Sequence, residues 1–376
     1  MKFPHFIYLL TLIPMLYSCS KESTQETEKT IDTPVVTDSL PAAAYFPPIS
    51  RTNEWETVSF NALGWNENKV PSLLQFLEEN NTDAFIILKN GRIVLEEYFG
   101  DFKMDDNHAW NSAGKNLTAM LTGIAQQEGF LKITDTTSTY LGDGWSSLTM
   151  EQEQKISIKN QLTMTTGLDY TVENNFCTDP ECLQYLNEPN SKWYYHNAPY
   201  TLLDDVIANA VNSDFNTYFS EKIKEPIGMQ GTFIKIGYNN VYFSTARSMS
   251  RFGILNLQEG VWDGEVILND AVYFNDMINS SQELNQAYGY LYWLNGKDSF
   301  RLPNTEAEYT GSLIPNAPDD LYAALGKNDQ KLYMVPSMDL VIVRMGGASD
   351  EELLGPSSFD NEIWGLLNEI IIQPTP

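Results

Sequence analysis

The sequence predicts an α/β protein in which an antiparallel sheet is flanked by helices and completed by both ends of the chain, with a helical region inserted. Three observations predict this arrangement. A β-hairpin pattern lies around residue 90, helical patterns fill about 112–260, and three apolar strand patterns follow residue 320. We therefore expect the sheet part at about 55–110 and 261–376, and the helical part at about 111–260.

The composition is that of a globular protein. The chain has 376 residues, 42% of them hydrophobic and 12% aromatic, which is enough for a large core in one or two domains. Its 23 basic and 50 acidic residues give a formal net charge of −27. This charge argues against a nucleic acid partner or an anionic membrane surface, because both attract basic proteins.

The first residues are predicted to be an export signal. Lys2 gives a positive start, and residues 6–16 are apolar but too few to span a bilayer. The stretch ends in Leu16-Tyr17-Ser18-Cys19, which resembles a bacterial lipobox. We expect residues 1–19 to be a lipoprotein signal with Cys19 lipidated, and the alternative is ordinary cleavage with Cys19 lost. The mature chain would then lie in the cell envelope, in the periplasm or at the cell surface, and contact the membrane through this lipid only.

A tether is expected between the signal and the folded part. Residues 20–50 are rich in Thr, Ser, Glu, Asp and Pro and hold few large apolar side chains. Such a segment cannot bury enough apolar surface to fold, so it is predicted to be disordered. Residues 51–376 form the predicted domain.

The elements of this domain follow from local patterns. Residues 84–88 and 93–99 are apolar strand patterns joined by Lys89-Asn90-Gly91-Arg92, whose Asn-Gly pair is typical of a tight hairpin turn. The apolar residues after Ser112 recur at offsets of three and four, which predicts an amphipathic helix. The other predicted elements are helices at about 70–79, 160–167, 200–207, 215–223 and 359–371, and strands at 321–325, 331–335 and 340–345.

Cys177 and Cys182 lie close together in a polar loop. In an exported protein this spacing predicts a short-loop disulfide. A metal site is the alternative, but outside the signal the chain offers only His108 and His196 as histidine ligands. We therefore expect neither a metal nor a cofactor.

Ser112-Ala113-Gly114-Lys115 places a nucleophile and a proton acceptor within one helical turn. A lysine can take the proton of a serine hydroxyl if burial lowers the pKa of its amine. The helix N-terminus adds backbone N–H groups that suit an oxyanion. The spacing alone is weak, since Ser18 and Lys21 repeat it, and the alternative is a helix cap followed by a solvated lysine.

A set of motifs in a fixed order gives this pair its context. The motifs are Ser112-x-x-Lys115, Leu162-Thr-Met-Thr-Thr-Gly167, Trp193-Tyr-Tyr-His-Asn-Ala-Pro-Tyr200, and Ala324-Leu325-Gly326 before Pro336. Together they resemble the serine β-lactamase-related superfamily, and most closely its class C branch with D-alanyl peptidases, esterases and 6-aminohexanoate-dimer-type hydrolases. The resemblance runs from about residue 55 to the end, and it implies a β-lactamase/transpeptidase-like fold and an acyl-enzyme mechanism.

The resemblance implies roles for four side chains. Ser112 would be acylated, Lys115 would share the proton transfers, and Tyr195 and Asn197 would form the family's Tyr-x-Asn motif. A phenol beside an ammonium is easier to deprotonate, so Tyr195 is a second candidate for the base. The sequence leaves open whether Lys115 or Tyr195 is the base, and the alternative for Tyr195 is an aromatic packed beside Trp193.

The third motif of the family departs from its usual pattern here. The corresponding stretch is Gly326-Lys327-Asn328-Asp329-Gln330, with Lys327 at the cationic position and Asp329 where glycine is expected. We expect Lys327, Asn328 and Gln330 to contact substrate, with a backbone N–H near Gln330 as the second oxyanion donor. The alternative is a polar hairpin turn. Asp329 is expected to narrow the cleft and repel a carboxylate, which argues against a true β-lactamase or penicillin target.

The sequence therefore predicts an exported serine hydrolase that cleaves a small-molecule ester, amide or peptide. One alternative within the enzymes is a β-lactamase or D-alanyl carboxypeptidase. The alternative from another class is a weakly active or inactive surface lipoprotein that uses the same fold to bind a peptide or glycan.

Overall fold

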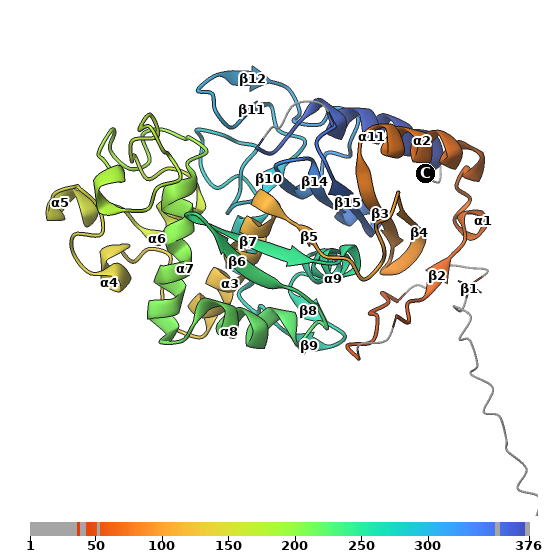
Figure 1. The fold of residues 1–376 in the computed structure, drawn as a ribbon, viewed down its shortest axis with the longest axis horizontal. Helices are drawn as coiled ribbons and strands as arrows, with labels where there is room; N and C mark the ends of the chain where they lie inside the picture. The colour runs from red at the N-terminus through yellow and green to blue at the C-terminus, as the bar shows by residue number, and fades with distance from the viewer. Residues whose placement is uncertain (1–35, 38–42, 51–52, 350–353, 373–376) are drawn as a thin grey trace, which may run out of the picture. The chain divides into compact units, whose positions relative to one another are not determined.

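The computed structural model describes residues 36–37, 43–50, 53–349 and 354–372 (Figure 1). The predicted signal, Cys19 and most of the predicted tether lie outside the described residues. The described part of that tether is not disordered, because Val36–Thr37 pairs with Thr57–Val58 and Tyr45 N–H donates to Asn90 O at 3.1 Å. Within the described ranges no helix is both long and apolar enough to cross a membrane.

A sheet of eight strands organises the described part of the chain. In spatial order its strands are β1 (Val36–Thr37), β2 (Thr57–Val58), β4 (Arg92–Tyr98), β3 (Thr82–Lys89), β15 (Leu340–Gly346), β14 (Gln330–Val335), β13 (Tyr322–Gly326) and β10 (Trp293–Leu294). The strands from β4 to β10 pair antiparallel, whereas β1 with β2 and β2 with β4 pair parallel. The sheet is therefore mixed, and the prediction of a wholly antiparallel sheet is wrong at this edge. The connection from β2 to β4 includes helices and β3, which is long enough for a parallel crossover.

Both ends of the folded part complete the sheet, as predicted. β3 pairs with β15 through Ile87 opposite Ile342, and the β3–β4 hairpin turns at Asn90 and Gly91. Gly91 has a φ of 80°, and a Cβ there would lie 1.9 Å from the carbonyl oxygen of Tyr45, so this turn requires glycine.

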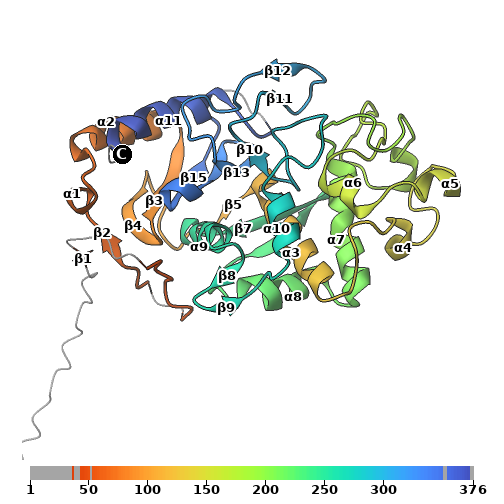
Figure 2. The ribbon, with the colours of Figure 1, turned by 180° about the vertical axis from the view of Figure 1, so that it is seen from behind.

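Helices cover both faces of the sheet (Figures 1 and 2). α2 (Val70–Glu79) and α11 (Ser358–Ile370) lie side by side on one face, while α9 (Ala246–Leu257) packs on β3, β14 and β15 from the other. This double cover explains why every residue of β13, β14 and β15 is buried.

The helical part contains the helix that follows the predicted nucleophile. Its elements are α3 (Lys115–Gln127), α4 (Ser138–Leu141), α5 (Met150–Glu153), α6 (Ile158–Leu162), α7 (Asn197–Val211), α8 (Phe215–Phe219) and a π-helical turn at Ser220–Lys224. α6 ends at Leu162 rather than at Gly167, because Met164 takes a positive φ of 59° that no helix can continue. The predicted helices at about 200–207 and 215–223 are present.

Two strands of a small three-stranded sheet lie in the region predicted as helical. β5 (His108–Ala109), β7 (Asn239–Ser244) and β6 (Thr232–Ile236) form it, and Phe233 is the one buried residue of β6. The remaining elements are helices α1 (Phe60–Leu63) and α10 (Ala271–Met277), strand pairs β8 (Val261–Trp262) with β9 (Glu265–Val266) and β11 (Ser299–Arg301) with β12 (Glu308–Thr310), and 3-10 turns at Glu67–Lys69, Asn111–Gly114, Pro180–Cys182 and Pro336–Met338.

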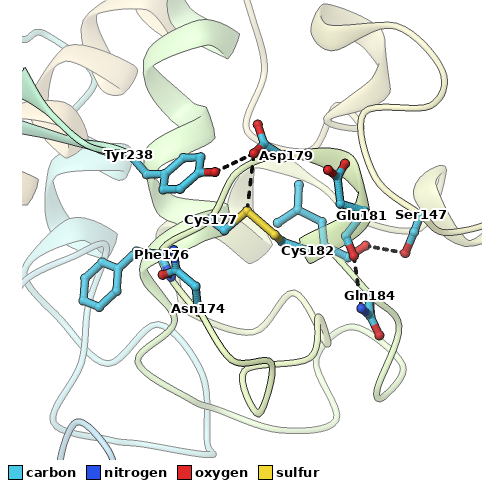
Figure 3. The surroundings of a disulfide bond; sticks show 10 residues. Ser147, Asn174, Phe176, Cys177, Asp179, Glu181, Cys182, Gln184 and Tyr238 are labelled. Carbon is cyan, nitrogen blue, oxygen red and sulfur yellow. Dashed lines mark hydrogen bonds between the residues drawn. A yellow bond between two sulfur atoms is a disulfide. The ribbon is translucent and has the colours of Figure 1, made fainter.

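The predicted disulfide between Cys177 and Cys182 is present (Figure 3). It closes a turn in the long loop between α6 and α7. The Tyr238 hydroxyl donates to Asp179 inside this turn at 2.5 Å. The same loop supplies the carbonyl oxygen of Asn175, which accepts from the backbone N–H of Ala198 in the first turn of α7 (3.2 Å). The disulfide therefore lies in a loop that is tied to the Tyr-x-Asn segment.

Candidate active site

Ser112 lies in the 3-10 turn Asn111–Gly114, directly before α3. The turn is fixed by a hydrogen bond from Ala113 N to Trp110 O (3.0 Å), and the buried Trp110 indole donates to Ser244 Oγ (2.8 Å). Ser112 itself is half-buried, so solvent reaches the residue at the mouth of the helix.

Lys115 meets Ser112 one turn into the helix. Its Nζ atom donates to Ser112 Oγ at 3.1 Å, and the residue is only 5% exposed. The amine also lies 4.2 Å from the ring centroid of Tyr200, so its surroundings are aromatic rather than aqueous.

Tyr195 approaches the same hydroxyl from the loop before α7. Its phenol is hydrogen-bonded to the Ser112 side chain, and the residue is 2% exposed. The Trp293 ring stacks on Tyr195 at 5.8 Å between centroids, and Tyr288 meets it edge-on at 6.3 Å. The aromatic run from Tyr288 to Trp293 is thus buried core that holds the phenol in place.

Burial shifts the pKa values of the two candidate bases, Lys115 and Tyr195, in opposite directions. It lowers the pKa of Lys115 from 10.5 to about 7, although the charge of Asp204 opposes the shift. Burial also raises the pKa of Tyr195, and its hydrogen bond with Ser112 only partly offsets this. The expectation that a neighbouring ammonium makes this phenol easier to deprotonate is therefore wrong, because desolvation of the phenolate outweighs it.

Gly326 is the glycine that this site requires. A Cβ at Gly326 would lie 2.5 Å from Trp110 O and 3.1 Å from Ser112 N, so the end of β13 touches the backbone of the Ser112 turn. Next to it, the Asn111 side chain donates to Lys327 O at 2.8 Å. The backbone of Gly326 and Lys327 therefore adjoins the Ser112 turn, and a backbone donor near Gln330 stays a prediction.

The Asp329 side chain is held inside the fold by its own partners. It is 3% exposed, pairs with Lys331 at 3.1 Å, and accepts from the hydroxyls of Ser349 (2.8 Å) and Ser357 (2.5 Å). Burial alone would raise the pKa of Asp329, but Lys331 and these hydrogen bonds hold it at about 2. The expectation that Asp329 narrows the cleft and repels a carboxylate is wrong, because a buried cation behind the hairpin binds this side chain.

The other residues predicted to contact substrate differ in burial and in position. Gln330 is fully buried, and its amide donates to Asn328 O and Gly346 O at 2.7 Å each, so this side chain serves the hairpin and not a substrate. Lys327 and Asn328 are half-buried at the turn beside Ser112. Asn197 is 3% exposed at the first position of α7, two residues after Tyr195. Substrate contacts of Lys327, Asn328 and Asn197 stay predictions.

His196 takes no visible part in the site. It is the N-cap residue of α7, and burial lowers its pKa to about 4. No hydrogen bond among the described residues links it to Ser112. Over the same residues no group of three or more His, Cys, Asp and Glu side chains is placed to hold a metal ion.

Sequence reasoning missed one buried acid near the site. Asp204 lies on α7, one turn after Tyr200, and is 9% exposed. Its only sequence signal is an acid at the i+4 position from Tyr200, within the apolar pattern that predicts this helix.

Comparison with known proteins agrees with this fold. The family model described as Beta-lactamase matches residues 75–346. The chain is 28% identical over 158 residues to PbpX of Bacillus subtilis (strain 168), which is described provisionally as a penicillin-binding protein, and 27% identical over 154 residues to the 6-aminohexanoate-dimer hydrolase of Paenarthrobacter ureafaciens. These matches cover 38% and 41% of the chain, and they span only 39% and 37% of the two relatives.

A solved structure extends the likeness to most of the fold. It is a Bacillus anthracis protein described provisionally as a 6-aminohexanoate-dimer hydrolase, and it matches with a TM-score of 0.62 at 20% identity over 86% of each chain. The architecture is that of the β-lactamase/transpeptidase-like proteins. The chain belongs to the beta-lactamase family, which includes serine hydrolases.

Proposed function

We propose that this protein is a serine hydrolase of esterase or amidase type that works through an acyl-enzyme on Ser112. The observation that carries the proposal is the convergence of Lys115 Nζ, 3.1 Å away, and the Tyr195 phenol on Ser112 Oγ. A buried amine with a pKa of about 7 is half neutral at neutral pH and is then able to accept a proton.

In this mechanism Ser112 Oγ bonds to the carbonyl carbon of an ester or amide, and its proton passes to the neutral amine of Lys115. The oxyanion that forms accepts hydrogen bonds from Ser112 N–H and from backbone N–H in the Gly326–Lys327 segment. When the oxyanion collapses, the C–O or C–N bond breaks. The Tyr195 phenol gives its proton to the leaving group and regains one from Lys115. Water then attacks the acyl-enzyme, which releases the acid and restores Ser112.

The pKa directions support Lys115 as the base and Tyr195 as the relay. At neutral pH the phenol of Tyr195 keeps its proton, so it is a donor in the resting site. Lys115 exchanges its proton near the same pH. A base with a pKa close to the working pH combines a useful neutral fraction with adequate basicity.

The test is covalent labelling with a fluorophosphonate, read by intact mass. We expect one adduct on the folded wild type, located on Ser112 and absent from Ser112→Ala. Lys115→Ala should lower the hydrolysis of short p-nitrophenyl esters by roughly 10³-fold or more, the scale of losing one member of a catalytic group. A folded wild type that neither carries an adduct nor turns over esters would refute the proposal.

The same assays address the alternatives. The altered third motif favours the binding-only lipoprotein, but Gly326 supplies the close approach and Asp329 is bound by Ser349. Ester turnover that depends on Ser112 dismisses it. Since Asp329 no longer argues against anionic substrates, nitrocefin hydrolysis decides between a β-lactamase and an esterase or amidase, and release of D-alanine from a peptide identifies a carboxypeptidase.

We also propose that the chain is exported and anchored in the cell envelope through a lipid on Cys19. The support is the sequence of residues 1–19 alone. Metabolic labelling with a palmitate analogue should mark the wild type and not Cys19→Ser, and wild type without label would refute the anchor. This outcome is independent of the chemistry at Ser112.

A further inference from the structure

The mechanism above does not use the buried acid Asp204. Its Oδ2 atom accepts from the Asn240 side chain on β7 at 2.9 Å, but its Oδ1 atom is buried and has no partner among the described residues. An unpartnered carboxylate oxygen costs about 1–3 kcal/mol, and more when it is charged. A position that costs this much needs a compensating role.

Asp204 and Lys115 lie on facing helices. α3 packs against α7, and Tyr200 and Asp204 lie four residues apart on α7, hence on one face of that helix. Lys115 Nζ lies 4.2 Å from the Tyr200 ring, while no direct ion pair joins it to Asp204. The Tyr200 ring therefore lies against the amine, and Asp204 follows it one turn later on the same face of α7.

Few charges act on this pair. Asp204 is the one group whose charge is felt at Lys115, where it favours the ammonium. At Asp204 the acting charges are Asp205 on α7, Lys115 on α3 and Lys235 on β6, and Asp205 and Lys235 are exposed. Burial raises the pKa of Asp204 to about 7, close to that of Lys115.

We propose that Asp204 is a positioning residue that acts through Lys115 and sets the pH at which this lysine exchanges its proton. This coupling goes beyond the proposed function. Its effect on hydrolysis rests on that function. With Asp204 ionised, the ammonium of Lys115 is favoured. With Asp204 protonated, the neutral amine is favoured. One proton shared between the two groups keeps Lys115 near the midpoint of its titration, where it can both accept and return the proton of Ser112.

The matched variants are Asp204→Asn and Asp205→Asn. The first keeps the shape of the side chain and an oxygen for the Asn240 amide, and removes the buried charge. The second removes an equal charge from the exposed neighbour on the same helix. A third variant, Asn240→Ala, leaves Asp204 in place and removes the hydrogen bond that favours its ionised form, so it tests the inference even if Asp204→Asn fails to fold.

The direct readout is the titration of Lys115 itself. Lysine labelled with ¹³C at Cε is incorporated, the Lys115 signal is identified by its absence in Lys115→Ala, and its shift is followed from pH 5 to 10. Because the charge of Asp204 favours the ammonium of Lys115, its loss predicts a midpoint lower by about one pH unit in Asp204→Asn. Asn240→Ala should move it the same way by less, and Asp205→Asn should leave it unchanged.

The second readout is the acidic limb of kcat/KM for a p-nitrophenyl ester, which should move to lower pH by the same amount. If Asp204 had only a structural role, Asp204→Asn would lower kcat/KM at every pH without moving the acidic limb. A Lys115 midpoint unchanged in both Asp204→Asn and Asn240→Ala overturns the inference. A shifted midpoint in a protein that does not hydrolyse esters upholds the coupling and refutes the proposed function instead.

Discussion

Replacing Lys115 by methionine should make the protein more stable while abolishing catalysis. Methionine has nearly the shape of lysine without its charge, and Lys115 is 5% exposed. Burial lowers the pKa of this amine from 10.5 to about 7. At about 1.4 kcal/mol per pH unit, holding the ammonium in this site costs about 5 kcal/mol.

The sign of the pH dependence follows from this lowered pKa. Below pH 7 the amine is charged in both states, so the folded wild type bears the full cost and Lys115→Met gains most. Between pH 7 and 10.5 the unfolded chain binds more protons than the folded one, so the wild type recovers stability as the pH rises. We expect the variant to be more stable by about 3–5 kcal/mol at pH 6, since loss of the hydrogen bond from Lys115 to Ser112 offsets part of the gain, and by about 1 kcal/mol or less at pH 9.5.

Urea unfolding at both pH values measures the effect, with the exposed Lys132 replaced by methionine as control. The control should follow the wild type at both pH values. The reasoning is refuted if Lys115→Met has a lower free energy of unfolding than the wild type at pH 6. It is also refuted if the difference in the free energy of unfolding is as large at pH 9.5 as at pH 6.

Three further predictions concern other parts of the site and its surroundings. Tyr195→Phe removes the phenol oxygen but keeps the ring packed, so kcat for ester hydrolysis should fall by about 10²–10⁴-fold with the melting temperature nearly unchanged, and a rate near wild type would contradict the relay role. Gly326→Ala should cost about 10²-fold in kcat/KM, because its Cβ displaces the strand from the nucleophile's turn, whereas Gly365→Ala, in a helix, should keep full activity. Replacing Cys177 and Cys182 by serine should lower the free energy of unfolding in urea by about 2 kcal/mol, and equal stability would mean that the cross-link adds nothing.

The long periodic elements of the fold were predictable from the sequence. The hairpin at Asn90-Gly91, the helix at 70–79 and the three C-terminal strands all appear where their patterns place them. Each of them has its signal within a few residues of chain. The β6–β7 hairpin was missed because its strands are mostly exposed or half-buried and lack the continuous apolar run of the C-terminal strands. The parallel edge of the sheet was missed because no local pattern records the direction of a strand's partner.

For the site, the sequence predicted the contact between Ser112 and Lys115 but not the tertiary contacts of the side chains around them. Ser112 and Lys115 are three residues apart on one helical turn, so their contact follows from helix geometry alone. The orientation of Asp329 depends on Lys331, which is two residues away, and on Ser357, which is distant in the chain. The role of Asp204 depends on Asn240 and on a facing helix. Contacts of this kind are set by tertiary packing, which no spacing rule contains.

The pairing of β3 with β15 has a consequence for how the chain reaches its native state. Ile86 and Ile87 are fully sheltered only when a strand some 250 positions further along the chain docks beside them. During synthesis the β3–β4 hairpin therefore keeps apolar side chains exposed until nearly the whole polypeptide has left the ribosome. We therefore expect slow, late closure of the sheet, and a chain shortened before residue 340 should aggregate rather than form a smaller native domain.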